Sequence, residues 1–132
     1  MFAKAIPDLK LRFLWLAMGY GLVLMVVYLS LTDNPVDMGM SFPYEDKVYH
    51  ALAYFTLMAW FAQIYHDKFQ RNMIALVFVV MGFSLEYFQS FNPNRIAEAG
   101  DLLANVSGVF LGFLLALTRV KNMFMRIEKL FS

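Results

Sequence analysis

The sequence lacks cysteine and is poor in charge. With no cysteine among its 132 residues, the chain cannot form disulfides, thiolate metal sites or a cysteine nucleophile. Charged residues make up only 16% of the chain and hydrophobic residues 61%, whereas soluble domains carry about 25% and about 45–50%. The net charge of +1 provides no global field for nucleic acid. The length fits one domain, and this composition argues against a soluble enzyme with a large cleft.

Several enzyme motifs are also missing. The sequence has no G-x-S-x-G, no H-E-x-x-H and no P-loop Gly-Lys-Ser/Thr. It holds only two histidines, His50 and His66. The acid-phosphatase signature of lipid phosphatases needs two histidines on one side of the membrane. Because the topology derived below separates His50 from His66, this reaction class is set aside as well.

The most prominent feature of the sequence is a set of four long apolar runs. They cover residues 13–31, 48–65, 73–91 and 102–118. Each is close to the ~20 residues that an α-helix needs to cross ~30 Å of hydrocarbon. Within lipid, backbone hydrogen bonds have to close inside each segment, which favours helices. We therefore expect an all-α, polytopic membrane protein with four transmembrane helices and short loops, forming a single transmembrane domain over residues 1–132.

The distribution of Lys and Arg predicts the orientation of these helices. Counted from the N-terminus, the regions outside the four runs hold 3, 1, 2, 1 and 4 of these residues. This alternation follows the positive-inside rule and predicts that both termini are cytoplasmic. The first run is longer than a signal-peptide core, and no A-x-A-like cleavage site follows it. We therefore interpret the first run as a retained anchor helix.

The residues after Thr118 form an amphipathic pattern. Apolar residues recur at three- and four-residue steps, and cations lie on the other faces. The apolar positions are Val120, Met123, Phe124, Ile127, Leu130 and Phe131, and the cations are Lys121, Arg126 and Lys129. Such a helix is expected to lie along the cytoplasmic leaflet, with a frayed helix end as the alternative. Gln63, near the inner edge of the second run, is expected to make a helix contact.

With this topology, nearly all the unusual polar side chains gather at the outer ends of three helices. They are Asp46, Lys47, His50 and Tyr54 in the second run, Glu86, Gln89 and Arg95 in and after the third, and Asp101 and Asn105 in the fourth. At about 100° per residue, the polar residues of each helix share one face. His50 and Asn105 are each four residues inside their helix starts, roughly 6 Å down and at the level of lipid headgroups. Deeper, Gly108-x-x-x-Gly112 and Gly82 would let the helices approach closely.

In this order, the residues resemble the VanZ-like family of small membrane proteins. The matching residues are Asp46, Lys47, His50, Tyr54 and Leu57, then Glu86, Gln89 and Arg95, and finally Asp101, Asn105 and Gly108. The resemblance is close over residues 46–112 and only general elsewhere. It implies an envelope-related protein of the bacterial cytoplasmic (inner) membrane. The founding member of the family is associated with low-level resistance to the glycopeptide teicoplanin.

The first hypothesis for the polar cluster is a site for a membrane lipid or a lipid-linked envelope precursor. Its cations would hold a phosphate or pyrophosphate, and its amides and hydroxyl would donate hydrogen bonds. The expected ligand-binding residues are Asp46, Lys47, Tyr54, Gln89, Arg95 and Asn105. The expected catalytic residues, which would move a proton, are Glu86, Asp101 and His50. Whether any reaction is catalysed stays open.

Other interpretations remain open at this point. Acids at the helix starts, Asp46 and Asp101, would favour the helix dipole, so the cluster could only tie the helices together, as in a non-catalytic scaffold or accessory subunit. A metal site would need His50, Glu86 and Asp101 together, and transport would need a polar path that the chain lacks. No metal, cofactor or nucleic acid is expected. A homo-oligomer or a membrane-protein partner stays open.

Overall fold

The computed structural model describes residues 10–31, 45–65, 67–91 and 99–131, without the side chains of residues 45, 46, 99 and 119. Within these ranges every regular element is helical. The elements are α1 (Arg12–Leu31), α2 (Glu45–Ile64), α3 (Lys68–Gln89), α4 (Ala99–Leu115), the 3-10 turn η1 (Arg119–Asn122) and the short helix α5 (Met123–Leu130). The predicted all-α fold is confirmed for the described residues.

Each predicted apolar run coincides with a helix, but the boundaries differ. α3 begins at Lys68 instead of residue 73, because the Asp67 side chain caps it by accepting a hydrogen bond from the N–H of Gln70 at 3.2 Å. α4 ends at Leu115, before Thr118, whose hydroxyl accepts from the N–H of Val120 at the start of η1. Apolar runs mark contact with lipid or core, whereas caps set the helix ends.

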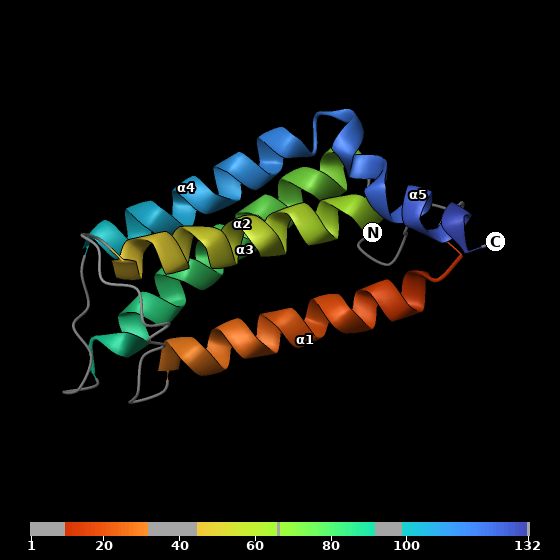
Figure 1. The fold of residues 1–132 in the computed structure, drawn as a ribbon. Coiled ribbons are helices and arrows are strands. Elements are labelled where there is room, and N and C mark those ends of the chain that lie inside the picture. Colours follow the sequence, from red (N-terminus) through yellow and green to blue (C-terminus); the bar gives the residue numbers. More distant parts are fainter. Residues whose placement is uncertain (1–9, 32–44, 66, 92–98, 132) are drawn as a thin grey trace.

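Successive helices run in opposite directions and form an up-and-down bundle (Figure 1). The most extensive contact is between α2 and α4, and α2 also contacts α1, α3, η1 and α5. α2 is therefore the central helix. The starts of α1 and α3, the ends of α2 and α4, and α5 lie at one end of the bundle (Figure 1), which we call the α5 end. The starts of α2 and α4 lie at the opposite end, which we call the site end.

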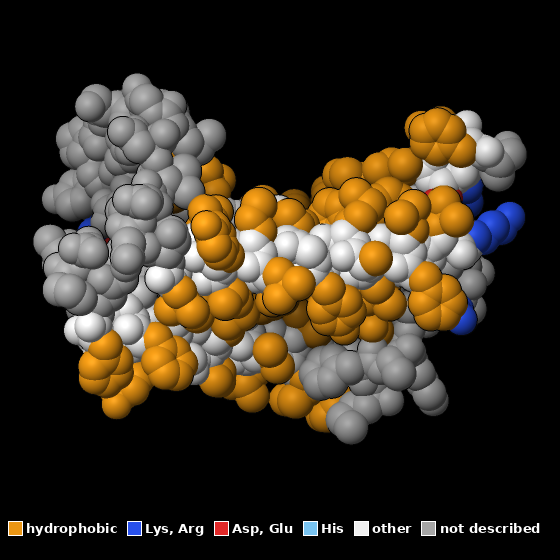
Figure 2. Space-filling model, turned by 90° about the horizontal axis from the view of Figure 1, so that it is seen from below, with side chains coloured by type: hydrophobic (Ala, Val, Ile, Leu, Met, Phe, Trp, Pro, Cys, Tyr) orange, Lys and Arg blue, Asp and Glu red, His pale blue; other side chains and the backbone are white. Residues whose placement is uncertain are grey.

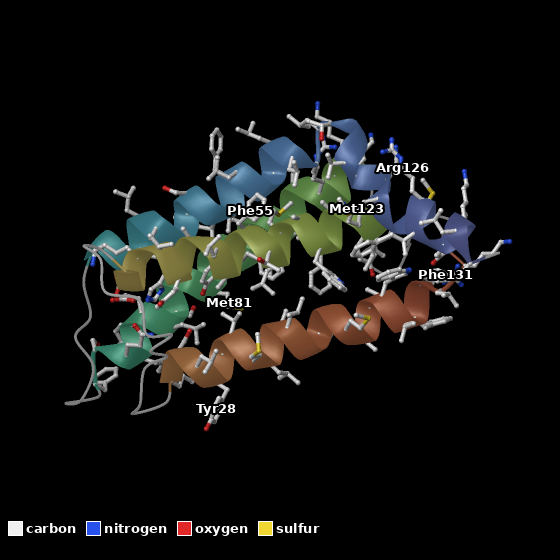
Figure 3. The ribbon with its side chains drawn as sticks, in the orientation of Figure 1. Tyr28, Phe55, Met81, Met123, Arg126 and Phe131 are labelled. Atoms are coloured by element: carbon white, nitrogen blue, oxygen red, sulfur yellow. The ribbon has the colours of Figure 1, made fainter. Side chains whose placement is uncertain are left out.

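The interior is formed largely by α2, and the outside of the bundle is apolar. Tyr54, Leu57 and Met58 are at most 1% exposed. By contrast, Phe13 and Tyr28 of α1 are 74% and 68% exposed, and Tyr28 points away from the other helices (Figure 3). Apolar side chains cover the middle of the surface seen in Figure 2, with Lys and Arg at one end. An apolar surface of this extent suits lipid rather than water.

The described part of the structure contains two or three candidate membrane spans, fewer than the four predicted. α1 and α3 are long and apolar enough to cross a membrane, and a third candidate combines residues 100–115 with 120–130 across a bend of 82°. α2 is not among these candidates in the described part of the chain. Its first turns carry Lys47 and His50, and Gln63 lies near its end. Four transmembrane helices and cytoplasmic termini therefore stay predictions.

The C-terminal segment is docked onto the bundle through Gln63. The Gln63 side chain donates from Nε2 to the carbonyl of Val120 at 2.6 Å and accepts at Oε1 from the N–H of Phe124 at 3.2 Å. This confirms the expected helix contact of Gln63. The Phe124 ring stacks on Trp15 of α1, with ring centroids 4.0 Å apart, and the Trp60 indole donates to the carbonyl of Trp15 at 2.9 Å. The segment predicted to be amphipathic is thus a folded part of the molecule.

Glu128 fastens α5 to the beginning of α1. Its carboxylate accepts hydrogen bonds from the backbone N–H groups of Lys10 and Leu11, at 2.8 and 2.9 Å, and from the indole Nε1 of Trp15 at 2.7 Å. N–H groups in the first turn of a helix lack intrahelical partners, and a carboxylate there also favours the helix dipole. Burial raises the pKa of Glu128, but the hydrogen bonds from Leu11, Trp15 and Lys10 outweigh it and hold this pKa below its usual value. The sequence analysis did not anticipate this contact.

Candidate functional site

Glycines let α2 and α4 touch where the polar residues converge. A Cβ atom built on Gly108 would overlap the carbonyl oxygen of Ala51, and one on Gly112 would lie 2.8 Å from Cβ of Met58 and 3.0 Å from the carbonyl of Phe55. Such distances require a close approach of the two backbones. The predicted stripe of Asp101, Asn105, Gly108 and Gly112 therefore faces α2.

Asp101 is the buried anion at the centre of the site. It lies in the first turn of α4 and is 4% exposed. Its Oδ1 is 3.4 Å from Nζ of Lys47, and its Oδ2 is 3.8 Å from Nε2 of His50. The Lys47 side chain also lies against Gly100, whose added Cβ would approach Cε of Lys47 to 2.6 Å. Burial of a carboxylate is tolerated here because a cation and the N-terminus of α4 face it.

His50 is held from both sides of its ring. Its Nδ1 is 3.0 Å from Oδ1 of Asn105, while its Nε2 faces the Asp101 carboxylate. Both ring nitrogens therefore face acceptors, and a neutral imidazole can donate to only one of them. If Nδ1 donates to Asn105, the lone pair of Nε2 faces the Asp101 carboxylate, and a proton added there keeps both contacts. His50 therefore bridges Asn105 and Asp101 and stays a candidate for proton transfer.

Asn105 connects three helices. It is buried on α4, contacts His50 of α2, and packs on α3 at Gly82, whose added Cβ would lie 3.2 Å from its Nδ2. A larger residue in place of Gly82 would displace the amide. Gly82 was expected to allow a close approach of helices, and it lies against Asn105 of α4.

Glu86 of α3 and Tyr54 of α2 are two further buried polar residues. Glu86 is 7% exposed and Tyr54 is 1% exposed. Among the described residues, the Tyr54 hydroxyl has no hydrogen-bond partner. Leaving a buried hydroxyl unpartnered costs about 1–3 kcal/mol.

Gln89, an expected ligand-binding residue, contacts α1. Its Nε2 donates to the carbonyl of Ser30 at 2.7 Å, which joins the end of α3 to the last turn of α1. Carbonyl groups in the last turn of a helix lack intrahelical donors, so this contact satisfies one of them. The structure thus places Gln89 in an interhelix tie.

The structure describes only some of the residues that were expected to form the site. The structure brings together Lys47, His50, Asp101 and Asn105, and it buries Tyr54 and Glu86. Asp46 lies in the first turn of α2, but its side chain is outside the described part of the chain, and Arg95 lies wholly outside it. In the described ranges, no group of three His, Cys, Asp or Glu residues is arranged to hold a metal. The metal interpretation through His50, Glu86 and Asp101 therefore gains no support.

The α5 end contains contacts that the sequence analysis missed. Glu128 was not singled out, although it is the only acid in a cationic amphipathic tail. A single acid among regularly spaced apolar residues does not by itself indicate a buried contact, because most such acids are solvated. Its position opposite the N-terminus of α1 could not be read from spacing.

The apolar helices and the buried polar cluster at one end define a helical protein of membrane type. The VanZ/LLP1 family model matches residues 20–122, which is most of the chain, and the protein belongs to this family. This confirms the resemblance drawn from the ordered polar residues. No curated protein and no solved structure shows a significant match to the sequence.

Proposed function

We propose that this VanZ/LLP1 protein crosses the bacterial cytoplasmic membrane four times, with both termini in the cytoplasm. The antiparallel order of α1 to α4 supports this topology, as does the alternation of cations along the sequence. The lower hydropathy of α2 is compatible with spanning, because α2 is the central helix and its neighbours cover it. In this topology the site end faces outward and the α5 end faces the cytoplasm.

The proposed activity is binding of a phosphate-bearing headgroup at the site end. The ligand would be a membrane lipid or a lipid-linked envelope precursor, since both present their phosphates at this depth. The carrying observation is the Lys47–Asp101 pair, in which the Lys47 side chain is 23% exposed and the Asp101 side chain only 6%. The buried carboxylate thus orients a lysine whose side chain is partly exposed. Asn105 and His50 hold Asp101 and α4 in place around it.

The same geometry argues for binding more than for a defined reaction. His50 is hydrogen-bonded to Asn105 through Nδ1, and Asp101 is paired with Lys47. Glu86 stays a candidate for moving a proton because it is a buried carboxylate. A link to teicoplanin susceptibility would follow if the ligand were an envelope precursor, and it rests on the family resemblance alone.

A second candidate function is a scaffold or accessory subunit whose polar cluster only ties helices together. The hydrogen bond from Gln89 to Ser30 favours it, because this predicted ligand-binding residue is used for packing. The Lys47–Asp101 pair is compatible with both functions. The two functions predict different results when a charge is removed. Headgroup binding predicts a loss of bound lipid at nearly unchanged stability, whereas the scaffold predicts a loss of stability.

Native mass spectrometry of the full chain in mild detergent separates the two functions. We expect the wild type to retain a phosphate-bearing adduct that Lys47→Gln loses while its thermal stability stays close to that of the wild type. Asp101→Asn tests the orienting carboxylate in the same way. Lys47→Arg, which keeps the positive charge, is the matched control and should keep the adduct.

The outcome that contradicts headgroup binding is equally specific. If the wild type and all three variants carry the same adducts, the cluster does not bind a headgroup. If Lys47→Gln and Asp101→Asn are both strongly destabilised and no discrete adduct is present on the wild type, the cluster serves as an interhelix tie.

A further inference from the structure

The carboxylate of Asp101 faces two side chains that can carry a positive charge. Its Oδ1 lies 3.4 Å from Nζ of Lys47, and its Oδ2 lies 3.8 Å from Nε2 of His50. A lysine is ordinarily cationic at neutral pH, whereas a histidine can change its charge between about pH 5 and pH 8. The positive charge that these two side chains direct at Asp101 therefore depends on one proton.

Asn105 determines which nitrogen of His50 is available for that proton. Nδ1 of His50 lies 3.0 Å from Oδ1 of Asn105, and this oxygen is an acceptor, so the hydrogen bond between them requires a hydrogen on Nδ1. In the neutral ring, Nε2 then presents a lone pair to the Asp101 carboxylate, and in the protonated ring it presents an N–H. With Nδ1 bound to Asn105, the contact with Asp101 is attractive when His50 is protonated.

Other titratable groups lie at the same end of the bundle. In the described part of the chain, their side chains belong to Tyr28 of α1, Lys47, Tyr49 and Tyr54 of α2, Glu86 and Tyr87 of α3, and Asp101 of α4. The carboxylate that faces the ring of His50 is that of Asp101. Glu86 is a second buried carboxylate, one turn beyond Gly82, against which Asn105 packs. Glu86 is therefore the alternative proton acceptor that a test has to exclude.

A phosphate bound at Lys47 would change the electrostatic surroundings of Asp101. The side chain of Lys47 is 23% exposed, whereas those of Asp101 and His50 are 6% and 17% exposed. An anionic headgroup would thus meet Lys47 first and draw its charge away from Asp101. Because a buried carboxylate without a cation is strongly unfavourable, Asp101 would need a replacement. Protonated His50 can provide it at the other oxygen of the same carboxylate.

We propose that phosphate binding at the site end is coupled to the uptake of one proton by His50. The phosphate pairs with Lys47, and the imidazolium of His50 takes over the pairing with Asp101. The proton comes from the solution, so the site gains one positive charge when it receives the anion. The inference rests on the proposed headgroup binding and adds its regulation, since acidity at the site end strengthens binding.

Isothermal titration calorimetry of the full chain in a neutral detergent measures both binding and proton uptake. The probe is short-chain phosphatidylglycerol, because its phosphodiester does not titrate in the range in which histidine does. The affinity of the wild type should fall as the pH rises, by up to about tenfold per pH unit where one proton is taken up. Binding heats in two buffers of different ionisation enthalpy should show that protons are taken up with the lipid.

Two histidine variants locate the proton. His50→Gln replaces the titrating ring by a neutral amide, and its affinity should lose the pH dependence and stay close to that of the wild type at about pH 8. The matched control His66→Gln removes the other histidine of the sequence and should bind like the wild type. Thermal unfolding shows whether both variants are folded.

A direct readout remains if His50→Gln does not fold. In His66→Gln protein with isotope-labelled histidine, the single ring signal in the NMR spectrum belongs to His50. Adding phosphatidylglycerol near neutral pH should shift this signal toward that of imidazolium.

The possible results separate this inference from the proposed function. If phosphatidylglycerol binds with an affinity that does not depend on pH, or leaves the ring signal of His50 unchanged, the coupling is wrong and headgroup binding stands. A pH dependence that persists in His50→Gln assigns the proton to a carboxylate such as Glu86 and also overturns the coupling. If phosphatidylglycerol binds at no pH, headgroup binding fails and the coupling fails with it.

Discussion

At the scale of single residues, two glycines decide how closely α2 and α4 approach. Gly108 lies against the backbone at Ala51, and Gly112 against Met58 and Phe55. Because the neighbouring atoms at Gly108 are backbone, no side-chain rotation can make room for a methyl group. The separation that brings Asp101 close to Lys47 depends on this contact.

The change Gly108→Ala should destabilise the protein. Forcing a methyl group into a packed contact costs about 1–3 kcal/mol, and the midpoint of thermal unfolding in detergent should fall accordingly. The matched control is Gly21→Ala, because a Cβ atom on Gly21 would meet nothing within 4 Å. Since alanine favours helices over glycine by about 1 kcal/mol, Gly21→Ala should leave the midpoint unchanged or raise it. Equal midpoints for the two variants would mean that α2 and α4 are not in backbone contact.

At the scale of elements, α5 is attached to two helices by two different side chains. Gln63 of α2 binds the backbone of η1 and α5, and Glu128 of α5 binds the backbone at the start of α1. A short helix would be marginal by itself. Its position therefore depends on these contacts and on the Trp15–Phe124 stack.

The Glu128 contact should depend on pH. Its pKa in the folded protein lies below the usual value, so the contact contributes its full stabilisation above about pH 4.3, where the carboxylate is ionised even in the unfolded chain. The contribution is lost as the pH falls through the lowered pKa. Wild-type tryptophan emission should therefore change in this acidic range, whereas Glu128→Gln should lack the step.

The neutral variant has a second expected effect. At pH 7, Glu128→Gln should lower the unfolding free energy by about 2 kcal/mol, the value of hydrogen bonds to a charged group. The control Asp67→Asn, which keeps an effective N-cap on α3, should retain the acidic step in the emission. If Glu128→Gln titrates like the wild type, the step belongs to another carboxylate.

At the scale of the whole molecule, the antiparallel order of four helices sorts the chain into two chemically different ends. Polar residues that are far apart in sequence meet at the site end, while cations gather at the α5 end. The apolar middle of the surface lies between them (Figure 2). The two ends of the bundle therefore differ in chemistry, and the proposed headgroup site lies at one of them.

Cysteine labelling tests this orientation, and the chain has no native cysteine to interfere. Ser90→Cys, at the exposed end of α3 on the site side, should react with an impermeant maleimide in intact cells. Met123→Cys, on the exposed face of α5, should react only after permeabilisation. The reverse pattern would invert the topology, and reaction of both in intact cells would contradict the sorting of the two ends.

The sequence by itself determined the helices, their approximate extents and the faces that carry polar residues. Periodicity and length are local properties, and an apolar segment of this length has few alternatives to a helix. The convergence of Lys47, His50 and Asp101 could also be predicted, since alternating helices place their polar ends together. The order and spacing of the polar residues are also local properties of the sequence, and they indicated the VanZ/LLP1 family.

Only the tertiary structure decided which of these groups pair with each other. The rotation and tilt of one helix against the next are set by packing, which spacing along the chain does not encode. Asp101 therefore pairs with Lys47, Gln89 binds the backbone of α1, and Glu128 contacts Lys10 across 118 residues of sequence. The neighbours of each of these side chains depend on how all the helices of the bundle pack. The partners of Asp101, Gln89 and Glu128 are therefore defined only by the tertiary structure.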